Sequence, residues 1–287
     1  MHYLNRDFLK HQSQHILDFY HHRVVDESGG YFHNFLDDGR VFSPEFRQLV
    51  SSTRIIVNFA SAAMVFKRSD YLEIARHGLN YLEQVHWLPL EQIYVWTLRD
   101  HQPEDVTQQA YGYAFVLLAY ATARKAGLVS SNDKLLQTYA LLEKRFFQPT
   151  YGLYADEISA DGHLSAYRGQ NANMHICEAM IAAFEATGER IFFERACLLA
   201  ENIAFRQANL TSGLIWEHYT ESFDIDWQYN KNDPKNLYRP WGFQPGHQTE
   251  WAKLLLQIHR HQPAPHWLVK AKFLFNRAFD MAWDAIE

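Results

Sequence analysis

The residues best suited to acid–base chemistry lie in the segment 245–251, PGHQTEW. Pro245 and Gly246 indicate a loop that turns into a helix, which the apolar residues after them continue at helical spacing. His247 would then lie in the first turn, where unpaired backbone N–H groups favour neutral imidazole, the form that a general base needs. Glu250, three residues later on the same face, can hold one tautomer of the ring. The segment predicts that His247 and Glu250 form a catalytic pair, although a solvated helix start is the plainer alternative.

A second pair with the same spacing, His175 and Glu178, follows Asn171 at another expected helix start. The Asn171 amide offers both donors and acceptors, as a ligand rich in hydroxyl groups requires. Two His-x-x-Glu pairs also permit a metal site, since His and Glu three residues apart can ligate one ion. A di-metal bundle site would need more carboxylates, and no phosphate-binding glycine loop is visible. We therefore expect a metal-free, cofactor-free site.

Arg54 and Tyr111 lie near the starts of two further expected helices. If alternate helices line the inside of a ring, the starts that carry Arg54, Tyr111, His175 and His247 meet at one mouth. Each residue alone has a structural interpretation: a surface ion pair, a core aromatic ring or a satisfied histidine. Together they favour a functional site.

Internal repetition predicts the architecture that positions these residues. Short turn-and-strand segments align at positions 30, 91, 152 and 213, a constant step of 61 residues. Such regularity is typical of a repeat protein or a closed toroid. Pairs of helical patterns fill the intervals, and the expected helices span 4–22, 46–68, 70–86, 105–127, 132–147, 171–187, 189–206, 246–261 and 265–285. The sequence predicts an all-α (α/α) toroid with short β-hairpins between helix pairs and no parallel sheet.

The length of the chain bears on how far this toroid is complete. Six helix pairs at this repeat length need about 366 residues, and the last pattern stops at Glu287 without a cap. We therefore expect residues 1–287 to form a single toroid domain that lacks its C-terminal helices. On that expectation, the 287-residue form is poorly soluble and inactive, because exposed apolar helix faces drive association.

Composition excludes several classes of protein. The chain carries 27 basic and 33 acidic residues, a net charge of −6 without a basic run, which argues against nucleic-acid binding. No apolar run approaches membrane-spanning length and no signal peptide core is visible, so we expect no membrane partner. Cys177 and Cys197 lie in helical patterns, so we expect both thiols to be buried. This use of cysteine favours a location in the reducing cytoplasm. We expect a monomer or a homodimer.

The motifs around these residues resemble those of the N-acylglucosamine 2-epimerase family. The resemblance rests on Arg54 and on two motifs, NxNMHxxEA at 171–179 and PGHxxEW at 245–251. The family includes cellobiose 2-epimerases, mannose isomerases and sulfosugar aldose–ketose isomerases. The resemblance implies an (α/α)6 barrel and proton transfer at the carbon next to a sugar carbonyl. The family's second catalytic histidine lies in the last inner helix, beyond Glu287.

The resemblance also implies roles for single residues. It implies that His247 is a catalytic acid or base and that Glu250 is its supporting carboxylate. Substrate binding or ring opening falls to a set of residues from the other helix starts: Arg54, Tyr111, Asn171 and His175. Arg239, in the loop that leads to His247, is a further candidate for substrate binding.

Proton transfer of this kind passes through an enediol, which needs a base of near-neutral pKa and donors at the developing oxyanion. We therefore expect an aldose–ketose isomerase of the mannose/fructose type that acts on a small monosaccharide or disaccharide. An N-acylglucosamine or cellobiose-type 2-epimerase is the close alternative. A glycoside hydrolase, which needs two carboxylates across the scissile bond, and an inactive sugar-binding remnant stay open.

Overall fold

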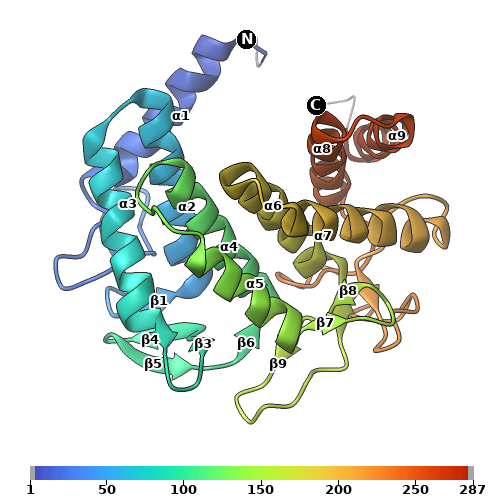
Figure 1. Cartoon of the computed structure of the whole chain (residues 1–287), viewed down its shortest axis with the longest axis horizontal. Coiled ribbons are helices and arrows are strands. Elements are labelled where there is room, and N and C mark those ends of the chain that lie inside the picture. Colours follow the sequence, from blue (N-terminus) through green and yellow to red (C-terminus); the bar gives the residue numbers. More distant parts are fainter. Residues whose placement is uncertain (1–3, 284–287) are drawn as a thin grey trace. The chain divides into compact units, whose positions relative to one another are not determined.

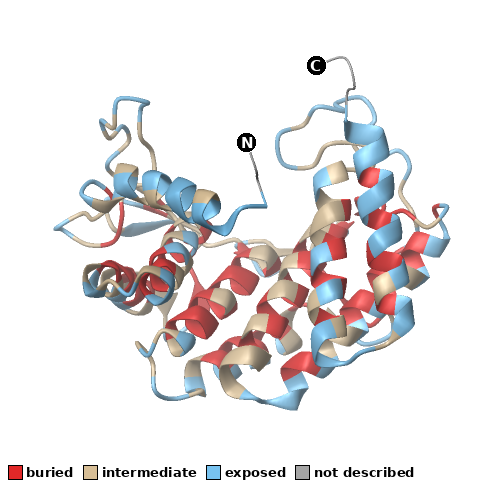
Figure 2. Ribbon diagram, turned by 90° about the horizontal axis from the view of Figure 1, so that it is seen from above, coloured by how far each residue is buried: buried red, intermediate tan, exposed pale blue. Residues whose placement is uncertain are grey.

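The computed structural model describes residues 4–283, most of which are helical (Figure 1). Two compact units divide the chain: unit 1 contains the residues up to 107 and 125–129, and unit 2 contains 108–124 and those from 130 onward. In both units the buried residues concentrate on the helices, whereas the connecting loops are largely exposed (Figure 2). The helical character and the short hairpins confirm the expected fold class.

Unit 1 is built on the helix pair α2 and α3, which pack against each other. Its helices are α1 (Arg6–His21), α2 (Leu49–Phe66), α3 (Ser69–Tyr81) and the π-helical turn η1 (Leu82–His86). Its strands are β1 (Phe46–Gln48), β2 (Trp87–Leu88), β3 (Ile93–Tyr94), β4 (Thr97–Arg99) and β5 (Gln102–Asp105). The order β1-β4-β5 makes a three-stranded antiparallel sheet, and β2 pairs with β3 in a hairpin.

Unit 2 contains the pairs α6/α7 and α8/α9, each packed closely together. Its helices are α4 (Ala110–Lys125), α5 (Asp133–Arg145), α6 (Gln170–Thr187), α7 (Arg190–Ala200), η2 (Glu201–Gln207), α8 (Pro245–His261) and α9 (Pro265–Ala282). Its strands are β6 (Gln108–Gln109), β7 (Phe147–Gln148), β8 (Leu153–Tyr154), β9 (Glu157–Ile158), β10 (Arg168–Gly169) and β11 (His218–Tyr219). The pairs β6–β9, β7–β8 and β10–β11 are all antiparallel.

The repeat predicted from the sequence is visible in the backbone of the four turns. At matching positions, the turns have a residue in the left-handed region of positive φ: Gly30 at 70°, Gln92 at 56°, Gly152 at 64° and Gly213 at 86°. The second turn therefore centres on Gln92, one residue after the aligned position 91. Glycine meets this conformation without strain at three of the four turns.

The segment after three of the four turns anchors a helix start. The residue four positions beyond the turn residue offers its backbone carbonyl to the N–H of the residue that begins a helix. The three observed bonds are Leu49 N–H to Trp96 O (2.9 Å), Ala110 N–H to Asp156 O (2.8 Å) and Gln170 N–H to Glu217 O (3.1 Å). These bonds satisfy donors that a helix start leaves unpaired, and they fix the side chains of Asp156 and Glu217 beside a helix start.

Buried amides clamp two helices of unit 2 to the segments after the turns. Asn173 on α6 accepts from the N–H of Tyr154 at 2.8 Å and donates to its carbonyl at 3.0 Å. Gln248 on α8 does the same to Ile215, at 3.0 and 2.7 Å. Both amides are fully buried. The matching bonds show that Asn173 and Gln248 hold the same position in consecutive repeats.

One helix among the described residues, α2, is long and apolar enough to cross a membrane. It has 18 residues with a mean hydropathy of 1.5, and half of it is buried in unit 1. The expectation that no apolar run approaches this length is therefore wrong for α2. One such helix is weak evidence for a membrane span, because core helices of soluble proteins pass the same test, and α2 packs against α3.

Candidate active site

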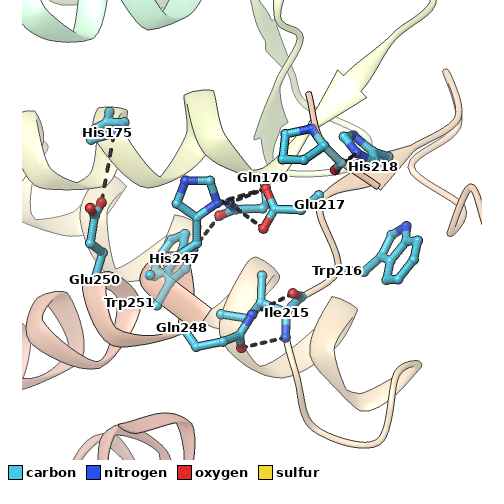
Figure 3. Close-up of polar contacts among 12 residues, drawn as sticks. Gln170, His175, Ile215, Trp216, Glu217, His218, His247, Gln248, Glu250 and Trp251 are labelled. Carbon is cyan, nitrogen blue, oxygen red and sulfur yellow. Dashed lines mark hydrogen bonds and ion pairs between the residues drawn. The ribbon is translucent and has the colours of Figure 1, made fainter. Parts of the chain in front are cut away.

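His247 lies in the first turn of α8, as the sequence predicts, but its ring faces Glu217 (Figure 3). Nδ1 of His247 lies 2.9 Å from Oε2 of Glu217, and the side chains are 25% and 4% exposed. Glu250 does not occupy the supporting position expected from the sequence, because the carboxylate that contacts the ring is that of Glu217. Glu250 shares the helix but lies toward His175, with its Oε2 3.9 Å from Nε2 of that ring.

Gln170, the first residue of α6, joins this pair to the core. The indole N–H of Trp251 donates to Oε1 of Gln170 at 2.7 Å. Nε2 of Gln170 lies 3.0 and 3.2 Å from the two carboxylate oxygens of Glu217, and 2.9 Å from Nδ1 of His247. Gln170 and Trp251 are fully buried. The His247 ring is therefore backed by a polar chain that reaches into the interior of unit 2.

The electrostatic setting of His247 differs from the one expected. Burial lowers the pKa of His247, but the hydrogen bond and charge of Glu217, with the charge of Glu250, outweigh it and raise the pKa above 6.5. The prediction that the helix N-terminus holds the ring neutral is wrong in direction, because an adjacent carboxylate acts more strongly than a helix terminus. A raised pKa favours a ring that can both take up and return a proton near neutral pH.

His175 forms a second cluster on α6. The Tyr111 ring meets the His175 ring edge-on at 5.1 Å. Nδ1 of His175 lies 3.1 Å from Oε2 of Glu178, whose Oε1 accepts from Nζ of Lys253 at 2.7 Å. Burial raises the pKa of Glu178, but the bonds from His175 and Lys253 outweigh it and lower the pKa to about 2. The structure thus brings together three of the predicted residues: Tyr111, His175 and Glu250.

The other predicted residues lie in different settings. Asn171 is in the first turn of α6, and its buried Oδ1 accepts no hydrogen bond from any other residue within 4–283. Arg239 is engaged inside unit 2, with Nη2 3.3 Å from Oε2 of Glu157 and Nη1 3.2 Å from the Tyr229 hydroxyl. Arg54 lies in the second turn of α2 in unit 1, with an exposed side chain. The functional roles of all three stay predictions.

Sequence reasoning missed Glu217 and Gln170. Aligning the turns at Gly152 and Gly213 would have placed Asp156 and Glu217 at the same position, four residues later. An acid directly after an apolar run is unusual, because buried carboxylates need partners. The acid at the same position in both repeats was therefore a signal for Glu217 that the sequence offered. The contact of Gln170 with Glu217 depends on the fold and is not visible in the sequence.

Within 4–283, no group of three or more His, Cys, Asp or Glu side chains is arranged to hold a metal ion. The two cysteines are free thiols; Cys177 is buried, as expected, whereas Cys197 is half-buried. Burial raises the pKa of both thiols, so neither is an activated nucleophile.

Comparisons with known proteins agree on one family. The family model for N-acylglucosamine 2-epimerase (GlcNAc 2-epimerase) matches residues 30–287. A D-mannose isomerase from Marinomonas mediterranea is 49% identical over 282 residues, which cover 98% of this chain and 71% of the relative.

Solved structures support the same conclusion. A crystal structure of D-mannose isomerase superposes with a TM-score of 0.96 at 48% identity, covering 99% of this chain and 73% of the other. Cellobiose 2-epimerase from Bacillus thermoamylovorans B4167 gives a TM-score of 0.83 at 17% identity, over 98% of this chain and 72% of the other, which shows the fold alone. These neighbours are (α/α)6 barrels, as the sequence predicts. With a family match over most of its length and a relative at nearly half identity, the chain belongs to the N-acylglucosamine 2-epimerase family.

Proposed function

We propose that this enzyme interconverts a free aldose and its ketose, with mannose and fructose as the preferred pair. The observation that carries this proposal is the 49% identity, across nearly the whole chain, to a D-mannose isomerase. The histidine at the start of α8, hydrogen-bonded to a buried carboxylate, supplies a group suited to the chemistry.

The reaction needs one proton to move between neighbouring carbons. Nε2 of His247 removes the proton from C2 of the open-chain aldose, and the electron pair of that C–H bond forms the double bond of an enediol. The imidazolium, whose proton exchanges with solvent, then delivers a proton to C1, while the hydroxyl proton of O2 passes to O1 and O2 becomes the carbonyl oxygen. A single base on one face of the enediol suffices for this transfer. The negative charge of Glu217 stabilises the imidazolium that exists between the two steps.

The predicted binding residues keep their proposed roles in binding the sugar. Tyr111 and His175, in contact on neighbouring helices, offer an aromatic ring and an imidazole to the sugar ring or its opening. Asn171 presents a buried amide oxygen that can accept from a sugar hydroxyl. Arg54 and Arg239 are proposed as donors to sugar oxygens, and Arg239 would have to share its guanidinium with Glu157.

We also propose a cytoplasmic enzyme that handles small sugars without nucleic acid, membrane or metal partners. The net charge of −6 and the two free thiols support this setting. Full turnover in excess EDTA is the expected result, and a loss of activity that zinc or manganese restores would contradict it.

The 2-epimerase alternative follows from the family itself, and product analysis separates it from isomerisation. Purified enzyme is incubated with mannose in D₂O, and the products are identified by NMR. We expect fructose with deuterium at C1, whereas glucose with deuterium at C2 would indicate epimerisation. His247→Asn is the control for a contaminating activity. Cleavage of a mannose disaccharide without isomer formation would instead indicate a hydrolase, and no conversion of any free sugar would overturn the proposal.

A further inference from the structure

The polar chain behind His247 decides which ring nitrogen is free to react. We propose that Glu217 and Gln170 are positioning residues that hold His247 as the Nδ1–H tautomer and leave Nε2 unprotonated as the reacting base. This inference rests on the proposed function for its kinetic consequences. Its structural part, the tautomer, can be tested without turnover.

The first step is the orientation of the Gln170 amide. The indole N–H of Trp251 is only a donor, so the Gln170 atom 2.7 Å away must be the carbonyl oxygen. The NH₂ group of Gln170 therefore faces Glu217. Nε2 of Gln170 lies 3.0 and 3.2 Å from the two carboxylate oxygens and donates to Glu217. Gln170 thus has a partner at each end of its amide, Trp251 and Glu217, without using Nδ1 of His247 as an acceptor.

The second step concerns Nδ1 itself, which lies 2.9 Å from both Gln170 Nε2 and Glu217 Oε2. An unprotonated Nδ1 would direct its lone pair at a carboxylate lone pair in a site where Glu217 is 4% exposed. A protonated Nδ1 instead makes a charge-assisted hydrogen bond there, which is the stronger kind. The buried carboxylate therefore selects the Nδ1–H form.

The third step is what this leaves at the other nitrogen. Within residues 4–283, the hydrogen bonds of the His247 ring all fall on Nδ1. Nε2 carries the lone pair on a side chain that is 25% exposed, whereas Glu217 lies behind the ring. Glu217 thus acts through His247 and does not itself contact the substrate.

The charged groups around the ring decide how its proton affinity responds to substitution. Glu217 faces Nδ1, and Glu250 lies on the same helix; both raise the pKa of His247. On α6, the His175 ring has Nε2 toward Glu250 and Nδ1 toward Glu178. Glu217→Gln removes the charge nearest to the ring and leaves the α6 groups unchanged. The pKa of His247 should therefore fall.

Nitrogen NMR of the full chain labelled with ¹⁵N-histidine tests the tautomer. The His247 signals are assigned by their loss in His247→Gln. We expect wild-type His247 to carry its proton on Nδ1 at high pH, and the Glu217→Gln variant to titrate at lower pH with a mixed tautomer. Glu221→Gln, an exposed acid in the turn after β11, is the matched control and should leave the signals unchanged. A wild-type Nε2–H ring, or an unshifted titration in Glu217→Gln, would overturn the inference.

Kinetics supply the second readout. Glu217→Gln should lower kcat by about 10²-fold with KM little changed, because the loss falls on the acid–base step. The acidic limb of its pH–rate profile should move to lower pH. Glu217→Asp keeps the charge and should recover part of the lost kcat. Unchanged kcat in Glu217→Gln would contradict the positioning role, whereas a wild-type enzyme without turnover would contradict the proposed function and leave the NMR result standing.

Discussion

Asp156 and Glu217 hold the same position in consecutive repeats of unit 2, yet their carboxylates serve different neighbours. Both residues are buried, and the backbone carbonyl of each accepts a hydrogen bond from the N–H at the start of a helix. The Asp156 carboxylate accepts from the N–H of Gly169 at 2.7 Å. Burial raises the pKa of Asp156 to about 7, despite the lowering effect of that bond and of two nearby arginines. The Glu217 carboxylate accepts from Gln170 and from His247.

The difference originates on the helix that follows. Since Asn173 and Gln248 make the same backbone clamp, the residues just before them are equivalent. Ala172 stands there on α6, and His247 stands there on α8. The repeat thus supplies a buried acid as part of its architecture, and a histidine at one helix position gives that acid an imidazole partner. On the proposed function, this partner is what makes a repeated scaffold position functional.

The largest effect is expected at the residue that distinguishes the two repeats. His247→Asn should lower kcat by about 10² to 10⁴-fold, the usual contribution of a positioned acid–base group. Steady-state kinetics on mannose, with circular dichroism to verify folding, would measure it. Ala172→Ser, at the equivalent position on α6, is the control and should keep most of the activity. Near-normal turnover of folded His247→Asn would remove the functional distinction between the repeats.

The equivalence of the two repeats can be tested by removing each buried amide clamp and measuring the free energy of unfolding. Asn173→Ala and Gln248→Ala each leave one buried N–H and one buried carbonyl without a partner, which should destabilise each variant by about 2–4 kcal/mol. Chemical denaturation would measure both. Gln248→Ala should also lower kcat, because it loosens α8 next to His247, whereas Asn173→Ala should affect turnover less. If only one variant were destabilised, the two repeats would not be equivalent.

Much of the fold could be predicted, because its signals are local. Helical spacing placed the ends of α8 and α9 within three residues of those observed, and the step of 61 residues located the turns. The misses come from tertiary structure. The helix expected at 105–127 begins only at Ala110, because β5 and β6 precede it, and α3 and α7 end in the π-helical turns η1 and η2.

The site was predictable in its residue types but less so in its pairings. Helix-start motifs identified His247 and the neighbours Tyr111 and His175. The partner of His247 was assigned by spacing along one helix, to Glu250. The actual partner, Glu217, lies 30 residues away and is brought close by the turn that anchors α6. A contact between two repeats does not follow from the residue spacing within either one, so only an alignment of the repeats could have suggested it.

The smallest expected effect concerns Asp156, the buried acid whose repeat has Ala172 at the position of the histidine. Folded Asp156 keeps its proton up to a pH of about 7, whereas the unfolded chain releases it near its ordinary value of 3.8. Between these values the folded state binds more protons, so Asp156 reduces stability as pH rises through that window. Asp156→Asn keeps an acceptor for the Gly169 N–H and removes the charge. We expect it to be more stable than wild type by about 1 kcal/mol or more at pH 8, and to match it near pH 4.

Urea unfolding between pH 4 and pH 8.5 would measure this difference. The comparison with the other repeat sharpens the test, because His247 also makes stability fall with rising pH. Its raised pKa contributes stability that is complete below 6.5 and is lost as pH rises through the folded value. Asp156→Asn should therefore remove the part of the decline that begins below pH 6.5 and leave the later part. Glu217→Gln should remove that later part instead. A decline that is identical in wild type and Asp156→Asn would show that the acid of the first repeat is ionised when folded, and the contrast between the two carboxylates would then rest on His247 alone.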